Sequence, residues 1–491
     1  MHMKLGPGGA KKVKRDKDLI SQLPDDILIS IISCLSTTDA VRTSLLSRRW
    51  RNLYRFLPLE IKLDCYYLLK HADFGIKTSI SSQRWRSVHG FLSRIESLCG
   101  NFLAENSLHN PKLIINSVDE FLKLRSGSKI HSFRLHCCLD GSVNDRFEHC
   151  ISSLGRLGVE ELCLTCCCSY SDTSDLSFSC HLFSEMPSLK YLRLSKCSLQ
   201  PSSRIQYNSL QTLVLMFVEV SRGAIECILS NCLKLQSLSI NCCKCPHKLS
   251  VRGPHLELKR LYIDGCQGVG EIELYASNLI LFQFDARKMV NLRFDHVPQL
   301  QSMILYVVEN IVPYVFGRLP IDVPHLKSMH FVTAGDSLQV SNGHTGIDTL
   351  SNLRRLDVNM NLSKMNLLSL VLILRRCPLL QEFGLNTNGM GNEPEVEEQP
   401  IVFHSELKKM EIGGFNGTKN EMEFALYILK SAINLVEMHI SRCCKVYLKS
   451  REGPGTWISI QRIPWSKNKY KTIHERLQGQ AVSKTAQVII Q

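Results

Sequence analysis

The sequence has no apolar run long enough to cross a membrane. Its longest apolar stretch, LLSLVLIL (Leu367–Leu374), falls far short of the roughly 20 residues that span a bilayer. The start, MHMKLGPGGAKKVKRDKD, also lacks the apolar centre of a secretory signal. We therefore expect the protein in the nucleus, the cytoplasm or both. Since these compartments are reducing, we expect its 21 cysteines to be free thiols or metal ligands, not a disulfide framework.

Signatures of catalysis are absent as well. No phosphate-binding loop is present, and no Ser-His-Asp or Cys-His arrangement has a supporting local motif. The stretch GCQGVG (Gly265–Gly270) opens no extended helix, as a dinucleotide site would require. The best metal candidate is CCKCPH (Cys242–His247), but its ligands are more crowded than the paired spacing of zinc sites. We expect no catalytic site, no metal site and no cofactor.

The charge balance is basic, and the excess lies near the two ends. The formal net charge is +14, while 44% of the residues are hydrophobic and 21% are charged, as in a globular protein. A basic end is usually a solvated tail, although it can also contact nucleic acid or a membrane, or serve as a nuclear import signal. We predict basic tails over residues 1–17 and 446–491, with no nucleic-acid or membrane partner. The basic residues at the ends include Lys11, Lys12, Lys14, Arg15, Lys17, Lys467, Lys469, Lys471, Arg476 and Lys484.

An internal repeat covers most of the chain. The pattern apolar-x-x-apolar-x-apolar occurs thirteen times, as in KLQSLSI and NLRRLDV, at intervals of 21 to 30 residues. Such intervals are typical of leucine-rich repeats, whose period is about 20–29 residues. The first positions are Ile130, Val159, Leu189, Leu210, Leu235, Leu258, Leu279, Leu300, Leu326, Leu353, Leu380, Leu407 and Leu435.

Each repeat predicts one short strand with an apolar face. Alternate residues of a strand point to one side, and stacked neighbours bury that side for one another. Between strands, Gly223–Leu235, Met365–Leu380 and Asn420–Leu435 show the apolar spacing of amphipathic helices. We predict an α/β fold in which helices form the convex back of a curved leucine-rich-repeat solenoid.

The segment LPDDILISIISCLSTTDAVRTSLLSRRWRNLY (Leu23–Tyr54) stands before the repeats. Pro24 and the acidic pair after it suit a helix start, Thr37 or Thr38 can cap a second helix, and Ser47 a third. About 32 residues cannot build an independent core. The segment therefore has more apolar surface than it can bury by itself.

This segment resembles an F-box of the form common in plant F-box proteins, through its Leu-Pro start, its Ile-Leu pair and the block SLLSRRWR. Tyr54 stands where many relatives have tryptophan. The resemblance implies an N-terminal three-helix F-box, which docks onto the Skp adaptor of a cullin-RING ubiquitin ligase. It leaves open which apolar residues face the adaptor and which face each other. The candidates for adaptor binding are Leu23, Pro24, Ile27, Leu28, Ile31, Leu35, Val41, Leu45 and Trp50.

The predicted domains follow from these patterns. We place the F-box at 18–60, a helical adaptor at 61–125 with helices in GFLSRIESLCGNFLAEN and NSVDEFLKLRS, and leucine-rich repeats at 126–403. Residues 404–445 resemble the FBD motif found after leucine-rich repeats in plant F-box proteins, with Gly414-Phe415-Asn416-Gly417 as a matching feature. Asn388–Pro400, acidic and rich in Gly and Pro, reads as an exposed loop.

The resemblance implies a non-catalytic substrate-recognition subunit, with a target protein on the repeats and a cullin reached through the adaptor. Two alternatives remain. The repeats could form an interaction scaffold outside ubiquitination, because a fold does not fix a function. The protein could also be a small-molecule co-receptor, with Arg193, Arg260, Tyr262 and Arg355 lining a pocket on the concave side, although charged residues on an exposed strand face are ordinary.

Overall fold

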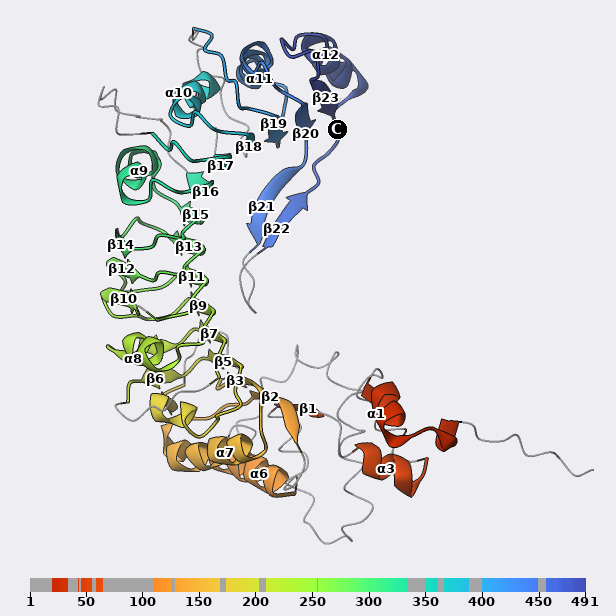
Figure 1. Cartoon of the computed structure of the whole chain (residues 1–491), viewed down its shortest axis with the longest axis vertical. Coiled ribbons are helices and arrows are strands. Elements are labelled where there is room, and N and C mark those ends of the chain that lie inside the picture. Colours follow the sequence, from red (N-terminus) through yellow and green to blue (C-terminus); the bar gives the residue numbers. More distant parts are fainter. Residues whose placement is uncertain are drawn as a thin grey trace, which may run out of the picture.

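A long parallel sheet organises the solenoid. The computed structural model describes residues 20–33, 43, 46–54, 59–64, 110–124, 129–167, 174–202, 209–253, 255–333, 349–360, 366–387, 400–448 and 456–491. Within these residues, 15 strands form one sheet that lines the inner side of an arc (Figure 1). In spatial order they are β1 (Leu59–Asp64), β2 (Ile130–His136), β3 (Glu161–Thr165), β5 (Tyr191–Ser195), β7 (Thr212–Met216), β9 (Ser237–Asn241), β11 (Arg260–Asp264), β13 (Leu281–Ala286), β15 (Ser302–Val307), β16 (Ser328–Thr333), β17 (Arg355–Met360), β18 (Glu382–Thr387), β19 (Lys409–Gly413), β20 (Glu437–Ser441) and β23 (Gln487–Ile490).

The predicted repeat register is confirmed. Equivalent apolar positions pair across neighbouring strands: Leu238 lies opposite Leu261, which lies opposite Phe282, and all three are fully buried. All thirteen repeat matches coincide with strands of this sheet, β2 to β20. The curved α/β solenoid predicted from the pattern is therefore the fold of the chain.

Two strands of the sheet lie outside the predicted repeats. Strand β1 pairs in parallel with β2, and its Ile61 and Leu63 are buried opposite Phe133 and Leu135. The sheet thus begins at residue 59, across the boundary that we predicted between the F-box and a helical adaptor. The alternation of Leu59, Ile61 and Leu63 has the period of a strand, but it lacks the full repeat pattern.

The prediction of a basic tail over 446–491 is wrong for the described residues of that range, 446–448 and 456–491. Strand β23 pairs with β20, and helix α12 (Lys467–Leu477) buries Ile473 and Leu477 in the core. Hairpin β21–β22 (Cys444–Leu448 and Thr456–Ile460) lies between β20 and α12 in the chain. Because this hairpin lengthens the last repeat, Val488 pairs with Met438 from 50 positions earlier, and the regular interval is lost.

The convex side varies with the length of each repeat. The predicted helices in Gly223–Leu235, Met365–Leu380 and Asn420–Leu435 are confirmed. Units of only 21 to 23 residues, from Leu235 to Leu300, return by strands instead, because a strand covers more distance per residue than a helix does. The convex elements are η2 (Gly141–Val143), α7 (Asn144–Arg156), β4 (Ser177–Ser179), η3 (Cys180–Phe183), β6 (Ser198–Gln200), β8 (Glu219–Val220), α8 (Ala224–Asn231), β10 (Lys248–Arg252), β12 (Glu271–Tyr275), β14 (Asn291–His296), η4 (Tyr314–Arg318), α9 (Leu319–Asp322), η5 (Leu367–Ser369), α10 (Leu370–Arg375) and α11 (Lys419–Ser431).

Further helical elements precede the repeats. Within the described residues the F-box segment contains η1 (Ile20–Gln22), α1 (Asp25–Ser33) and α3 (Arg48–Tyr54). Helix α6 (Pro111–Leu124) confirms the predicted helix in NSVDEFLKLRS, and it packs beside α7. The other predicted adaptor helix, GFLSRIESLCGNFLAEN, and the acidic loop up to residue 399 lie outside the described residues.

Candidate functional site

Helices α1 and α3 are held together by a charged contact. The guanidinium of Arg49 on α3 donates to Asp25 Oδ1 from Nε at 2.9 Å and from Nη2 at 2.6 Å. The same Nη2 donates to the carbonyl of Leu23 at 2.6 Å. Ser47 Oγ accepts from the backbone N–H of Trp50 at 3.3 Å, which agrees with its predicted role as a cap. These bonds fix the start of α3 against the start of α1.

The two helices bury one set of predicted adaptor residues and expose another. Leu28 is fully buried and Trp50 is 5% exposed, so both belong to the core. Ile27 and Ile31 are 43% and 40% exposed and lie one helical turn apart on α1. Pro24 is also exposed, three residues before Ile27. Helix α1 thus carries an apolar surface on the side away from its own core.

The remaining candidates are placed as follows. Leu23 is half-buried and packs against the core, while Leu35, Val41 and Leu45 lie outside the described residues. Two further apolar residues of the segment are exposed, Ile20 at 58% and Leu46 at 69%, and neither is among the predicted adaptor residues. Helical spacing could not mark Ile20, because it lies in η1, before α1.

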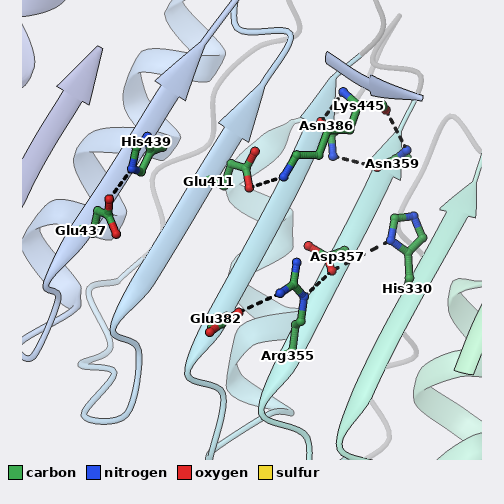
Figure 2. Close-up of polar contacts among 10 residues, drawn as sticks. All are labelled: His330, Arg355, Asp357, Asn359, Glu382, Asn386, Glu411, Glu437, His439 and Lys445. Carbon is green, nitrogen blue, oxygen red and sulfur yellow. Dashed lines mark hydrogen bonds and ion pairs between the residues drawn. The ribbon is translucent and has the colours of Figure 1, made fainter. Parts of the chain in front are cut away.

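The concave face of the solenoid carries a connected polar cluster near its C-terminal end (Figure 2). Arg355 on β17 donates from Nε to Asp357 Oδ2 at 2.8 Å and pairs with Glu382 on β18 at 3.0 Å. His330 Nδ1 on β16 lies 4.0 Å from Asp357 Oδ2. Burial lowers the pKa of His330 to about 4, which the nearby carboxylate of Asp357 opposes. The neutral imidazole is therefore the form in the folded protein at neutral pH.

Asparagine side chains dock hairpin β21–β22 onto this face. Asn386 Nδ2 donates to Asn359 Oδ1 at 2.9 Å, and Asn359 Nδ2 donates to the carbonyl of Lys445 at 3.3 Å. The N–H of Lys445 donates to Asn386 Oδ1 at 3.0 Å, which closes the ring (Figure 2). Lys445 Nζ also donates to Glu411 Oε2 at 2.6 Å. Lys445 of β21 thus contacts side chains of β17, β18 and β19. The hairpin lies on the inner side of the arc (Figure 1).

The four residues considered for a small-molecule pocket do not converge. Arg193 is on β5, Arg260 and Tyr262 are three strands away on β11, and Arg355 is four strands further on β17. Tyr262 is buried, and Arg355 is already paired with two carboxylates.

One pocket in the described part of the chain lies on the convex side instead. It is lined by residues that include His255, Tyr275 and Arg252, and it contains none of those four. Its basic side chain, Arg252, is already paired with Glu273 and Asp295, each at 2.6 Å. A ligand anion would therefore have to displace an existing partner from Arg252.

The possible ligands of the metal candidate CCKCPH are divided between buried and exposed positions. Cys243 and Cys245 are buried, while Cys242 and His247 are exposed. Among the residues that the structure describes, no group of three His, Cys, Asp or Glu side chains is arranged to hold a metal ion.

Comparison with known proteins decides the family. A profile of the F-box domain matches residues 20–65. A profile of the leucine-rich-repeat domain of At1g61320/AtMIF1 matches residues 121–486, about three quarters of the chain. The chain belongs to the plant F-box/LRR-repeat family. In this F-box/LRR protein the matched domain extends to 486, which agrees with the inclusion of α12 in the solenoid.

Relatives of this F-box/LRR protein include several from Arabidopsis thaliana. The putative F-box/LRR-repeat protein At5g38386 is 25% identical over 465 residues, covering 91% of this chain and 94% of its own length. The F-box protein At3g59000 is 26% identical over 469 residues, which is 86% of either chain. The F-box/FBD/LRR-repeat protein At5g53840 is 54% identical over 59 residues, 12% of this chain and 13% of its own length.

An F-box followed by leucine-rich repeats is the general arrangement of a substrate-recognition adaptor of Skp-cullin-F-box ligases, whose F-box binds the Skp adaptor and which is typically non-catalytic. The helices within the described ranges include none that is both long and apolar enough to span a membrane.

Proposed function

We propose that this protein is the substrate-recognition subunit of a Skp-cullin-F-box ubiquitin ligase. Its F-box would dock onto the Skp adaptor, and its solenoid would hold a target protein for ubiquitination. Other subunits would perform the transfer, while this chain supplies proximity and orientation. We also propose that it works in the nucleus, the cytoplasm or both.

The observation that carries the proposal is the exposed apolar side of α1. Ile27 and Ile31 are each about two-fifths exposed, although the buried Leu28 and Ile32 stand beside them in the same helix. Covering the exposed part of each isoleucine would contribute about 1 kcal/mol, a fraction of the value for full burial. With Pro24 beside them, these residues form a small apolar surface that a partner can cover.

Replacing the exposed residues tests this role. We expect Ile27→Ser with Ile31→Ser to weaken binding of a Skp adaptor at least tenfold in an isothermal titration, because both side chains lose their apolar contact. The melting temperature should change little, since neither side chain belongs to the core. The matched control is Val308→Ser, which removes a 57% exposed apolar residue next to β15. Adaptor binding of the double variant at wild-type strength would contradict the proposal.

A further inference from the structure

Hairpin β21–β22 has an apolar face that its own fold leaves exposed. Val446 pairs with Ile458 and Cys444 with Ile460, so these four side chains lie on one face of the ribbon. Cys444 is buried, but Ile458 and Ile460 are 38% and 43% exposed. A two-stranded ribbon is at best marginally stable alone, and further contacts on its apolar face would stabilise it.

One edge of the hairpin is also open. Lys445 directs its N–H and its carbonyl to the side chains of Asn386 and Asn359, away from β22. In an antiparallel pair of strands, a residue whose N–H and carbonyl both point away from the partner strand lies opposite a residue whose N–H and carbonyl also point away. Ser459, the partner of Lys445, therefore turns its N–H and carbonyl to the outer edge of β22. In the described part of the chain this sheet has two strands, and Ser459 is exposed.

Strand β22 itself contains no lysine, no proline and no bulge. Natural edge strands are commonly blunted by lysine, proline or a bulge. Strand β22 reads Thr-Trp-Ile-Ser-Ile, a composition that favours strands, and its register with β21 is regular. Its main-chain groups are thus available to a further strand.

The chain on either side of the hairpin is basic. Between residues 442 and 471, six of the described residues are lysine or arginine and none is acidic, although Lys445 is paired with Glu411 on β19. Arg442 Nε donates to the carbonyl of Ile463 at 3.1 Å. The side chain of Ile463 is 83% exposed. Lys467 and Lys469 are exposed in the first turn of α12. A partner segment that carries carboxylates between its apolar residues would complement this charge.

We infer that the open edge of β22 binds an extended segment of the target protein, rich in β-branched and acidic residues. The inference rests on the proposed function and names the kind of segment that the solenoid would recognise. The added strand would exchange main-chain hydrogen bonds with Ser459, as in other strand-addition complexes. Its apolar side chains would cover Ile458 and Ile460, and its carboxylates would lie near Arg442 and Lys467.

A labelled peptide tests this inference on the full chain in complex with the Skp adaptor. The probe is an eight-residue peptide that alternates valine and glutamate, and its binding is followed by fluorescence anisotropy. We expect Ser459→Pro to weaken binding at least tenfold, because proline has no N–H to donate yet is tolerated at a strand edge. Ser459→Ala, the matched control, should bind within twofold of wild type. A peptide with lysine in place of glutamate should bind at least tenfold more weakly.

A second variant tests the inference in case Ser459→Pro disrupts the hairpin itself. Ile458→Ser with Ile460→Ser keeps every main-chain group and should also weaken binding at least tenfold. Equal binding by wild type and this double variant would overturn the inference, as would equal binding of the two peptides. A single-stranded oligonucleotide that displaced the peptide at lower concentration, or a chain dimer lost in Ser459→Pro, would assign the surface to another partner. Adaptor binding, unchanged in all these variants, reports separately on the proposed function.

Discussion

The amides of Asn359 and Asn386 take the place of a neighbouring strand for β21. A strand edge presents an N–H and a carbonyl side by side, and a carboxamide presents the same two groups. Here one amide donates to the carbonyl of Lys445 and the other accepts from its N–H. Both asparagines lie on the concave side of the sheet, so two side chains at the end of their strands decide where the hairpin stands.

At the same scale, His330 makes stability depend on pH. Burial lowers its pKa to about 4, and Arg355 and Lys445 add to this effect. In the unfolded chain the pKa is about 6.5, so between these values the unfolded state binds the proton and the folded state does not. Stability is therefore lost as the pH falls from about 6.5 towards 4. The loss at pH 4 is about 3 kcal/mol, since one pKa unit corresponds to about 1.4 kcal/mol.

We expect His330→Gln to flatten this pH dependence. Urea unfolding midpoints measured at pH 7 and pH 4.5 should differ less for the variant than for wild type, because glutamine does not titrate. The control is His255→Gln, whose side chain is exposed. An unchanged difference between the two pH values in His330→Gln would show that another group is responsible.

The sequence could not predict which apolar residues of helix α1 are exposed and which are buried. Helical spacing places Ile27 with Ile31, and Leu28 with Ile32, but both pairs are equally apolar. Which pair is buried depends on where α3 packs, and Arg49 fixes that position through a contact 24 residues away in sequence. No local pattern contains this information.

At the scale of elements, helix α11 shows how a turn and a helix start are joined. Thr418 accepts from the N–H of Glu421, while the carboxylate of Glu421 accepts from Thr418 and Asn416. Gly414, with φ of 73°, leads into this turn, and a Cβ there would lie 2.1 Å from the carbonyl of Thr387. The run Gly414-Phe415-Asn416-Gly417, noted from the sequence, is thus the turn that feeds a capped helix.

Removal of the N-cap of α11 should destabilise the protein by an amount typical of helix caps. We expect Thr418→Ala to lower the free energy of unfolding by about 1 kcal/mol, because the N–H of Glu421 loses its acceptor. Chemical denaturation gives this value directly. Thr418→Ser keeps the hydroxyl and should stay near wild type, so a serine variant as unstable as alanine would argue against the capping role.

Elements that repeat could be predicted, and elements that interrupt the repeat could not. Thirteen strands followed from one apolar pattern because each unit meets the same neighbours. Strand β23 has Val488 and Ile490 at the equivalent positions, but the inserted hairpin puts them 50 residues after their partners in β20. Its basic surroundings then suggested a tail, although the apolar Ile473 and Leu477 of α12 reach the core.

For the whole molecule, these last elements close the end of the solenoid. Gln478 donates from Nε2 to the carbonyl of Val488 at 3.0 Å, on a strand that ends the sheet. Helix α12 packs beside α11 and covers the last repeat. A solenoid needs such a cap because its terminal repeat has a neighbour on one side.

Opposite faces of β23 provide a test of this cap. We expect Val488→Ser with Ile490→Ser to lower the melting temperature by several degrees, because both side chains face the core. Gln487→Ser with Ile489→Ser changes the concave side of the same strand and should have a much smaller effect. Calorimetry gives the melting temperatures of both variants. Equal melting temperatures would show that β23 does not cap the solenoid.

The early start of the sheet has a consequence for geometry. Helix α3 ends at Tyr54 and β1 begins at Leu59, already part of the sheet. In the proposed ligase, four intervening residues would leave little slack between the adaptor and the arc. The solenoid would then hold a target protein at a nearly fixed position relative to the adaptor. That position would determine which lysines of the target come within reach of the ubiquitin donor. Lengthening that junction would change the pattern of modified lysines before it changed affinity for the target.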